Sequence, residues 1–321
     1  MHSFQELSAL FEKQFNKRHF PETPVNLYDA AQYILTIGGK RVRPVAVLLG
    51  NELFDELHPS VMDVANSIEL FHNFSLIHDD IMDKAPLRRG LPTVHINFGE
   101  STALLAGDVM LVAAYECLNK IQAAAVHPIL SLFNKTAREV CEGQQMDMDF
   151  EKKPSITMDE YVEMISLKTS VLLAASLQMG AILGGSGKGN QEKLFAFGKN
   201  LGIAFQVQDD YLDCFGDPEK FGKQVGGDIL ANKKTFLLIH TMEVANDLQK
   251  KELDILLHSN PADKVARVQQ LYRDCGSDKW ATSLKDKYDG IATSYLEDIA
   301  VLSARKQHLQ ELAAYLLMRD H

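Results

Sequence analysis

Apolar residues recur every three or four positions through most of this 321-residue chain, whereas sustained alternation of apolar and polar residues is hard to find. A clear run of this kind has its apolar positions at Val61, Val64, Ile68, Phe71, Phe74 and Ile77. Such spacing follows the turn of an α-helix and gathers the apolar side chains on one face. The sequence therefore predicts an almost all-α fold.

The predicted helices are interrupted at Gly38-Gly39 and within 85–92, 153–158, 184–189, 216–227 and 259–261. None of these stretches has the character of an interdomain linker, and hydrophobic residues make up 46% of the chain, enough for one large core. We therefore expect a single domain over residues 1–321, with roughly a dozen helices packed around a central cavity.

A membrane-spanning or secreted protein is not expected. Uninterrupted apolar stretches, such as Val171 to Ala175, are far shorter than the roughly 20 residues of a membrane-spanning helix. The N-terminal segment mixes charged with apolar residues and lacks the apolar core of a secretory signal. The four cysteines form no CxxC pair, which favours reduced thiols and a cytoplasmic location. The net charge of -10 argues against nucleic acid as a partner.

Two clusters of aspartates share one spacing, and we name them the first aspartate cluster (Asp79, Asp80, Asp83) and the second aspartate cluster (Asp209, Asp210, Asp213). On a helix, the outer two carboxylates of each cluster lie about one turn apart. Such like charges repel unless a cation neutralises them, and Mg²⁺ prefers oxygen ligands of this kind. One cluster alone could be a solvated acidic face. Two clusters, each after a strongly apolar helical stretch, favour a metal site.

Basic residues accompany both clusters. Arg88 and Arg89 follow the first, Lys223 and Lys233 follow the second, and Lys40, Arg41 and Arg43 lie upstream in GGKRVRP, the segment 38–44. Guanidinium and ammonium groups hold phosphate oxygens without a metal, although each of these residues alone could be a surface charge. No P-loop, dinucleotide-binding glycine motif, nucleophile elbow or HExxH motif is present. The combination favours metal-assisted diphosphate chemistry.

Several motifs, taken together in order and spacing, carry a resemblance to a known family. They are GGKRVRP at 38–44, HNFSLIHDDIMD at 72–83, RRG at 88–90, PTVH at 92–95, GQQMD at 143–147, Lys168-Thr169, FQVQDDYLD at 205–213 and GKQVGGDILANKKT at 222–235. The chain resembles the trans-isoprenyl diphosphate synthases, the short-chain polyprenyl synthetases of the geranylgeranyl and farnesyl diphosphate type. The resemblance implies the isoprenoid synthase fold, a single all-α bundle around a central active-site cavity.

The resemblance also implies roles for particular residues. Asp79, Asp80, Asp83 and Asp209 would bind Mg²⁺, for which Mn²⁺ could substitute, with Asp210 and Asp213 in the same acidic wall. Arg88, Lys168, Lys223 and Lys233 would hold the allylic diphosphate, and Thr169 and Gln206 would direct oxygen dipoles at the developing cation. Lys40, Arg43, His72 and Arg89 would bind isopentenyl diphosphate, although His72 alone could be a core imidazole. Gln144 and Asp147 would support these groups from behind.

The implied reaction is the head-to-tail condensation of isopentenyl diphosphate with an allylic diphosphate. In this family, the positions five and four residues before the first aspartate cluster help to set product length, and here they are Phe74 and Ser75. A bulky Phe74 argues against long chains while Ser75 leaves some room, which favours the C20 product, geranylgeranyl diphosphate, over C15 farnesyl diphosphate. The resemblance further implies a homodimer.

Two other functions fit parts of the same pattern. A terpene cyclase of this fold would use the first aspartate cluster, but would normally carry a different second metal motif and would not need Lys40, Arg43 and Arg89 for a second diphosphate. A regulatory subunit that only binds an active synthase would be expected to have eroded aspartate clusters, and both clusters are intact here.

Overall fold

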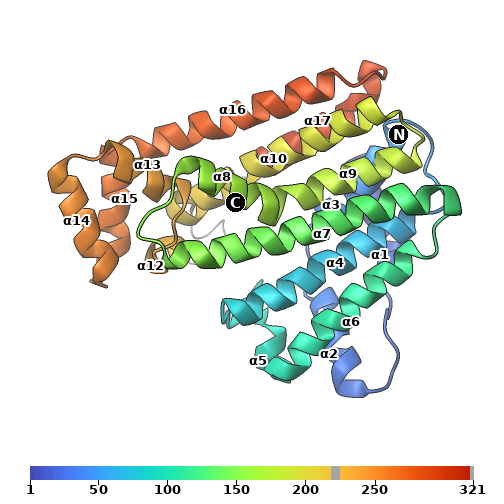
Figure 1. The fold of residues 1–321 in the computed structure, drawn as a ribbon, viewed down its shortest axis with the longest axis horizontal. Helices are drawn as coiled ribbons and strands as arrows, with labels where there is room; N and C mark the ends of the chain where they lie inside the picture. The colour runs from blue at the N-terminus through green and yellow to red at the C-terminus, as the bar shows by residue number, and fades with distance from the viewer. Residues whose placement is uncertain (218–224, 319–321) are drawn as a thin grey trace. The chain divides into compact units, whose positions relative to one another are not determined.

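The computed structural model describes residues 1–217 and 225–318, and its regular structure is almost entirely helical (Figure 1). The prediction of an almost all-α fold is confirmed. The sole sheet among the described residues is the two-stranded hairpin of β1 (Leu87–Arg88) and β2 (Leu91–Pro92). Each predicted interruption that the structure describes in full lies between two helices. The interruption at 216–227 lies partly outside the described residues.

Backbone contacts group the chain into two compact units, each described here by itself. Unit 1 consists of Met1–Lys135, Ala175–Phe195 and Ile299–His308, and unit 2 of Thr136–Ala174, Ala196–Asp298 and Leu309–His321. Helices α7 (Ala123–Lys152), α9 (Val171–Leu183), α10 (Lys188–Phe215) and α17 (Ser303–Leu317) contribute residues to both units. The single domain over residues 1–321 stays a prediction.

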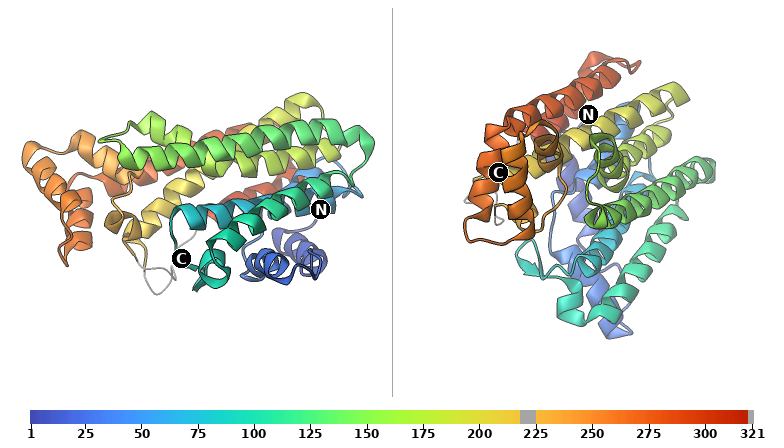
Figure 2. Two further views of the ribbon diagram at one scale, coloured as in Figure 1. Left: turned by 60° about the horizontal axis from the view of Figure 1, so that its bottom comes forward. Right: turned by 60° about the vertical axis from the view of Figure 1, so that its left-hand side comes forward.

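Unit 1 is built on a pair of long helices, α4 and α6, which run side by side in Figures 1 and 2. Its own elements are α1 (Phe4–Phe15), α2 (Val25–Thr36), α3 (Val42–Glu52), α4 (Val61–Met82), β1, β2, α5 (Val94–Phe98) and α6 (Glu100–Leu118). Helix α3 is buried along nearly its whole length. A Cβ at Gly180 of α9 would lie 2.0 Å from the carbonyl oxygen of Val47, so glycine is what lets the α3 and α9 backbones approach so closely.

Unit 2 contains α8 (Met158–Ile165), the π-helical turn η1 (Ser166–Ser170), α12 (Gly227–Leu230), α13 (Phe236–Val244), α14 (Asp247–His258), α15 (Lys264–Asp274) and α16 (Ser277–Glu297). Thr157 caps α8 in a capping box with Glu160, which fixes where that helix begins. Tyr161 and Phe236 are fully buried in the core of this unit, where Trp280 packs against Phe236. Figure 2 shows α14 and α15, in orange, side by side.

Two helical segments of the described chain, Glu100–Leu118 and Met158–Leu183, are long and apolar enough by composition to cross a membrane. The second segment has 72% of its most apolar window buried, and the first packs lengthwise against α4. Helix packing in the core therefore accounts for the apolar character of the second segment, whereas only 39% of the window of the first is buried.

Candidate active site

The first aspartate cluster lies at the C-terminal end of α4 in unit 1. Asp79 and Asp80 belong to the last turn of the helix and Asp83 is its C-cap residue. Asp80 is only 2% exposed, whereas Asp83 is exposed. The C-terminal end of a helix carries partial negative charge, so three carboxylates there repel both one another and the helix dipole. The location favours a bound cation.

Arg88 on β1 supplies one such cation from within the chain. Its Nε donates to both carboxylate oxygens of Asp80, at 3.0 and 2.8 Å, and its Nη2 donates to Oδ1 at 2.7 Å. The tight turn of the hairpin, with Arg89 and Gly90 at positive φ, brings β1 back towards the end of α4. Arg88 is thus positioned beside the first aspartate cluster, as a clamp for an anion bound there requires.

A second group of predicted residues meets around the GGKRVRP segment, also in unit 1. Arg43 Nη1 donates to His72 Nε2 at 3.3 Å. Burial first, and then the charge of Arg43, hold the pKa of His72 well below its usual range, so the imidazole stays neutral and accepts this bond. Burial also lowers the pKa of Arg43, to about 10.

Arg89 approaches the same segment from the hairpin. A Cβ at Gly39 would lie 2.9 Å from Arg89 Nη1, so the guanidinium rests against the glycine backbone. Lys40 is exposed beside it. The structure therefore brings Arg43, His72 and Arg89 together, and we name these three residues with Lys40 the cationic cluster. Its members offer donors for an anion and no carboxylate, which contrasts with the first aspartate cluster.

The second aspartate cluster lies in the last turns of α10 in unit 2, and its three members differ in their surroundings. Asp210 is buried and accepts hydrogen bonds from the Tyr161 hydroxyl and from Gln206 Nε2, the latter at 2.8 Å. Burial, followed by the charge of Asp228, raises the pKa of Asp210 to about 7.

Asp213 Oδ1 accepts from the backbone N–H of Asp228 at 2.9 Å, at the start of α12. Asp209 is half-buried, and its carboxylate has no ion-pair or hydrogen-bond partner among the described residues. Within this cluster, Asp210 and Asp213 thus accept hydrogen bonds from the protein itself, while the oxygens of Asp209 remain available to a ligand.

The turn η1 presents Lys168 and Thr169 in the same unit. Lys168 Nζ donates to Asp147 Oδ2 at 2.6 Å, and Thr169 Oγ1 donates to Gln206 Oε1 at 3.4 Å. π-Helical turns are rare and often mark functional positions. Asp147 thus contacts Lys168, and its supporting role stays a prediction.

For three of the predicted site residues, the structure gives less information about what their side chains contact. Both amide atoms of Gln144 are buried without a hydrogen-bond partner in the described part of the chain. Lys233 Nζ lies 3.9 Å from Asp228 Oδ1. Lys223 lies outside the described residues.

The aspartates fit a magnesium ion only in part. Among the described residues, no group of three or more His, Cys, Asp or Glu side chains is close enough to hold a metal by itself. Mg²⁺ in phosphate-handling enzymes usually takes only one or two carboxylates and completes its shell with water and substrate phosphates. The carboxylate oxygens of Asp79, Asp83 and Asp209 suit that mode of binding. For Asp80, a metal would have to compete with Arg88.

The two residues predicted to set product length lie on α4. The Phe74 ring contacts the Phe71 ring at 5.6 Å and the His78 ring at 4.8 Å between centroids. Phe71 in turn contacts Phe133 edge-on at 5.3 Å. Ser75 Oγ donates to the His72 carbonyl at 2.8 Å. Phe74 therefore lies within a row of ring contacts, between His78 on one side and Phe71, backed by Phe133, on the other.

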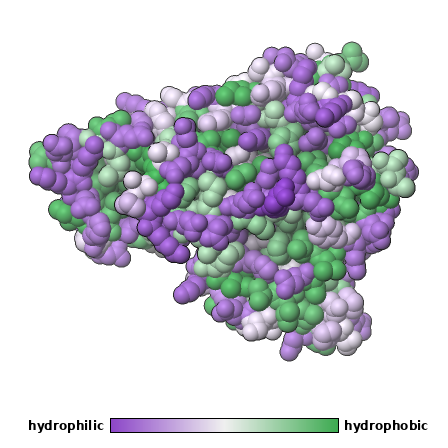
Figure 3. Space-filling model, in the orientation of Figure 1, coloured by the Kyte–Doolittle hydropathy of each residue, from purple (hydrophilic) through white to green (hydrophobic). Residues whose placement is uncertain are grey.

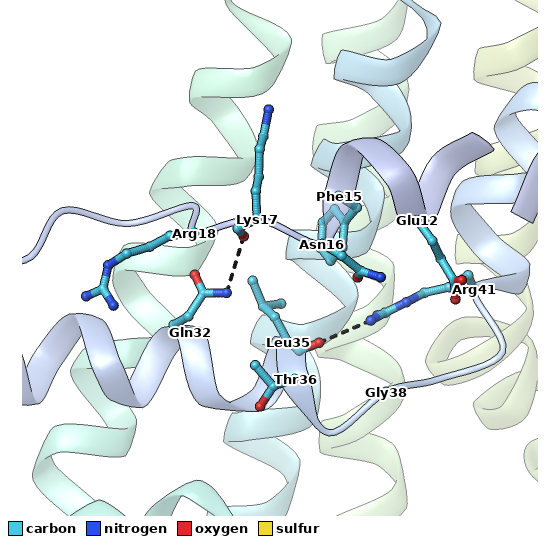
Figure 4. A pocket seen from close by; sticks show the side chains of 10 residues that line it. All are labelled: Glu12, Phe15, Asn16, Lys17, Arg18, Gln32, Leu35, Thr36, Gly38 and Arg41. Atoms are coloured by element: carbon cyan, nitrogen blue, oxygen red, sulfur yellow. Dashed lines mark hydrogen bonds between the residues drawn. The ribbon is translucent and has the colours of Figure 1, made fainter. Parts of the chain in front are cut away.

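A cavity of about 540 Å³ lies elsewhere in unit 1, against α1 and α2 (Figure 4). Its lining includes Phe15, Leu35, Gly38 and Arg41, and it contains neither aspartate cluster. Sequence reasoning gave no indication of this cavity.

Sequence reasoning also missed two residues that contact the site. Tyr161 donates to Asp210, and Glu69 forms a buried ion pair with Arg41. Glu69 could not have been found from a local signal, because it falls between the apolar positions Ile68 and Phe71 and leaves the helical period of α4 intact. Tyr161 gives no such signal, since a tyrosine in an apolar stretch is ordinary in a core.

Comparisons with known proteins agree with one another. The polyprenyl synthetase family matches residues 24–275. The geranylgeranyl diphosphate synthase of Methanosarcina mazei is 37% identical over 307 residues, covering 93% of this chain and 91% of that protein. The geranylfarnesyl diphosphate synthase of Natronomonas pharaonis is 36% identical, covering 94% and 92%.

Solved structures give the same picture of the fold. A crystal structure of a geranylgeranyl pyrophosphate synthase matches with a TM-score of 0.94 at 38% identity, covering 99% of both chains. A polyprenyl synthase from Caulobacter crescentus CB15, complexed with calcium and isoprenyl diphosphate, matches with a TM-score of 0.87 at 25% identity, covering 99% of this chain and 96% of that one.

Proposed function

Because the chain belongs to the polyprenyl synthetase family and is a short-chain prenyl diphosphate synthase, we propose that it condenses isopentenyl diphosphate with an allylic diphosphate and ends at C20 geranylgeranyl diphosphate. The observation that supports this proposal is that unit 1 contains two different arrangements of basic side chains. Arg88 accompanies aspartates, whereas Arg43, His72 and Arg89 gather without any. Two unlike diphosphates need two unlike sites.

The allylic diphosphate is assigned to the aspartate clusters. Asp79, Asp80, Asp83 and Asp209 would hold Mg²⁺, which supplies positive charge to the diphosphate leaving group. The binding of calcium by the Caulobacter crescentus relative supports a divalent cation here. Arg88 and Lys168 are assigned to this diphosphate, and the assignment is supported by the hydrogen bonds that each donates to a carboxylate oxygen, Arg88 to Asp80 and Lys168 to Asp147. Lys233 and Lys223 are assigned to it as well.

Breaking the allylic C–O bond leaves a resonance-stabilised cation. The oxygens of Thr169 and Gln206, one hydrogen bond apart, are assigned to stabilise that charge without adding to it covalently. Isopentenyl diphosphate, held by Lys40, Arg43, His72 and Arg89, then attacks through its double bond and loses a proton. Neutral His72 serves this step by orienting the Arg43 guanidinium, because it accepts from Nη1.

The C20 length rests on Phe74 and Ser75. A phenyl ring backed by Phe71 and Phe133 is a firm obstacle to a growing tail, while the small Ser75 beside it leaves space for part of the chain. Two of the relatives are named for C20 and C25 products, so the proposed length equals the shorter of the two. C15 farnesyl diphosphate is the nearest alternative.

A homodimer in the cytoplasm is also proposed. Leu104, Leu105 and Val112 on α6 are each at least half exposed, and Ile96 on α5 is similarly exposed. Figure 3 shows apolar side chains gathered over α6. A helix with this much exposed apolar surface is suited to burial against a second copy of the chain.

Calorimetric titration of each substrate alone tests the two-site assignment. Isopentenyl diphosphate should bind equally well with Mg²⁺ and with a chelator, because the cationic cluster contains no carboxylate to be bridged. The allylic diphosphate should bind only with Mg²⁺. If isopentenyl diphosphate required Mg²⁺, or if the allylic diphosphate bound as well without it, the assignment of the two sites would be wrong.

A further inference from the structure

A buried ion pair joins the GGKRVRP segment to α4 in unit 1. Arg41 and Glu69 are only 5% and 4% exposed, and Arg41 Nη1 donates to Glu69 Oε1. Arg41 Nη2 donates to the Leu35 carbonyl at 3.1 Å, and its guanidinium lies 5.1 Å from the centre of the Phe15 ring. None of these contacts belongs to the cationic cluster or to either aspartate cluster.

The backbone at Arg41 requires such anchoring. Arg41 has a φ of 50°, in the left-handed region, and is the N-cap residue of α3. A residue other than glycine is strained there and keeps this conformation only when its surroundings hold it. The contacts to Glu69, Leu35 and Phe15 provide that restraint. They fix the point at which the chain turns from Lys40 into α3.

The ion pair also lies on the same face of α4 as His72 of the cationic cluster. Glu69 and His72 are three residues apart on α4 and share a face. Arg41 contacts the first of them, and Arg43 contacts the second at 3.3 Å. Asn73 Nδ2 donates to Glu69 Oε1 at 3.1 Å and keeps the carboxylate in place. Two parallel contacts therefore fasten the start of α3 to α4.

We propose that Arg41 and Glu69 are positioning residues for isopentenyl diphosphate. By holding the strained turn against α4, they keep Lys40 and Arg43 directed at one diphosphate. The inference rests on the proposed function, since it assigns the cationic cluster to that substrate. Neither residue touches the substrate itself.

The variant Glu69→Gln distinguishes a positioning role of Glu69 from a purely electrostatic effect of its charge on the diphosphate. Glu69 is a negative charge close to Arg43 and Arg89, so its removal would strengthen diphosphate binding if only long-range attraction mattered. If Glu69 holds Arg41 in place, its removal weakens binding instead. We expect the KM for isopentenyl diphosphate to rise about tenfold, the loss expected from one charged hydrogen bond. The KM for the allylic diphosphate should change less than about twofold.

The cavity offers a second and independent readout. Arg41 forms part of its wall, together with Leu35 and Gly38, and Figure 4 shows the guanidinium reaching towards the Leu35 carbonyl. In Arg41→Ala, added guanidinium at concentrations far below those that unfold proteins can enter this space and occupy the vacated position. It should lower the raised KM for isopentenyl diphosphate, whereas urea at the same concentration should not, because urea carries no charge for Glu69.

Glu52→Gln is the matched control. Glu52 is 5% exposed, lies on α3 and pairs with the His2 ring at 2.5 Å, but has no contact with the cationic cluster. Its substitution should lower the thermal unfolding temperature without changing either KM. Arg41→Lys replaces Arg41→Ala if the latter does not fold.

The outcomes are distinguishable. An unchanged or lowered KM for isopentenyl diphosphate in Glu69→Gln would overturn the inference, as would an equal rise in the KM of both substrates. If the unaltered protein incorporated no isopentenyl diphosphate at all, the proposed function itself would fail before this comparison could be made.

Discussion

At the scale of single residues, identical side chains in one motif have different tasks. Asp209, Asp210 and Asp213 are equivalent in the sequence, yet Asp210 is held by Tyr161 and Gln206, and Asp213 by the backbone of Asp228. The sequence alone could not separate them, because Tyr161 and Asp228 lie outside the motif and only the fold brings them to it. The role of the cluster as a whole in the chemistry stays a prediction.

Asp209→Ala and Asp213→Ala should therefore differ. Asp209→Ala should lower kcat/KM at least about 100-fold, as expected for a lost electrostatic contact in the transition state, with unfolding stability unchanged or slightly raised. Asp213→Ala should lose about 1 kcal/mol of stability, the typical cost of removing an acceptor at a helix start. Steady-state kinetics and urea unfolding measured on both variants check this. Equal losses of stability would show that the two carboxylates are equivalent.

His72 gives a residue-scale prediction for pH. Its pKa in the folded protein lies well below the ordinary 6.5, first because of burial and then because of Arg43. The unfolded chain therefore binds this proton at higher pH than the folded protein does. The stability that the neutral imidazole contributes is complete above pH 6.5 and is lost progressively as the pH falls below it.

Urea unfolding at pH 7.5 and 5.5 would measure the effect. The difference in unfolding free energy between the two pH values should be smaller in His72→Gln than in the unaltered protein, because glutamine has no proton to gain. An identical difference in both proteins would mean that His72 takes up its proton as readily in the folded protein as in the unfolded chain.

At the scale of elements, α4 organises unit 1. Along its length it presents Phe74, then Asp80 at its end, and on its face towards α3 the acceptors Glu69 and His72. Helical spacing predicted this element well, since its apolar residues keep the period throughout. Its contacts could not be predicted, because spacing says which face is buried and not which residues lie opposite.

The proposed control of product length by Phe74 and Ser75 also belongs to this element. Phe74→Ala should shift the main product beyond C20, because it removes the ring in front of Phe71 and Phe133 and leaves the tail to reach those two side chains. Ser75→Phe should shift it towards C15. Chromatography of the dephosphorylated products would measure both shifts. If Phe74→Ala still stopped at C20, another group would set the length.

At the scale of the whole molecule, the sequence predicted the family and the all-α fold but not the contacts between distant segments. The motifs around 38–44, 72–83 and 205–213 led directly to the family, and the helical period led to the all-α fold. The π-helical turn at Lys168, the cavity beside α1 and the pair of Arg41 with Glu69 had no recognisable local signal. Each depends on contacts between segments that are distant in sequence.

The most direct test of the central claim uses the whole protein with Mg²⁺, labelled isopentenyl diphosphate and each allylic diphosphate in turn. The label should enter a trans-prenyl diphosphate, with C20 as the main product, and a chelator should abolish its incorporation. Incorporation that stops at C15 would leave the condensation intact and contradict the assigned length. Failure to incorporate any label in the presence of Mg²⁺ would contradict the account as a whole.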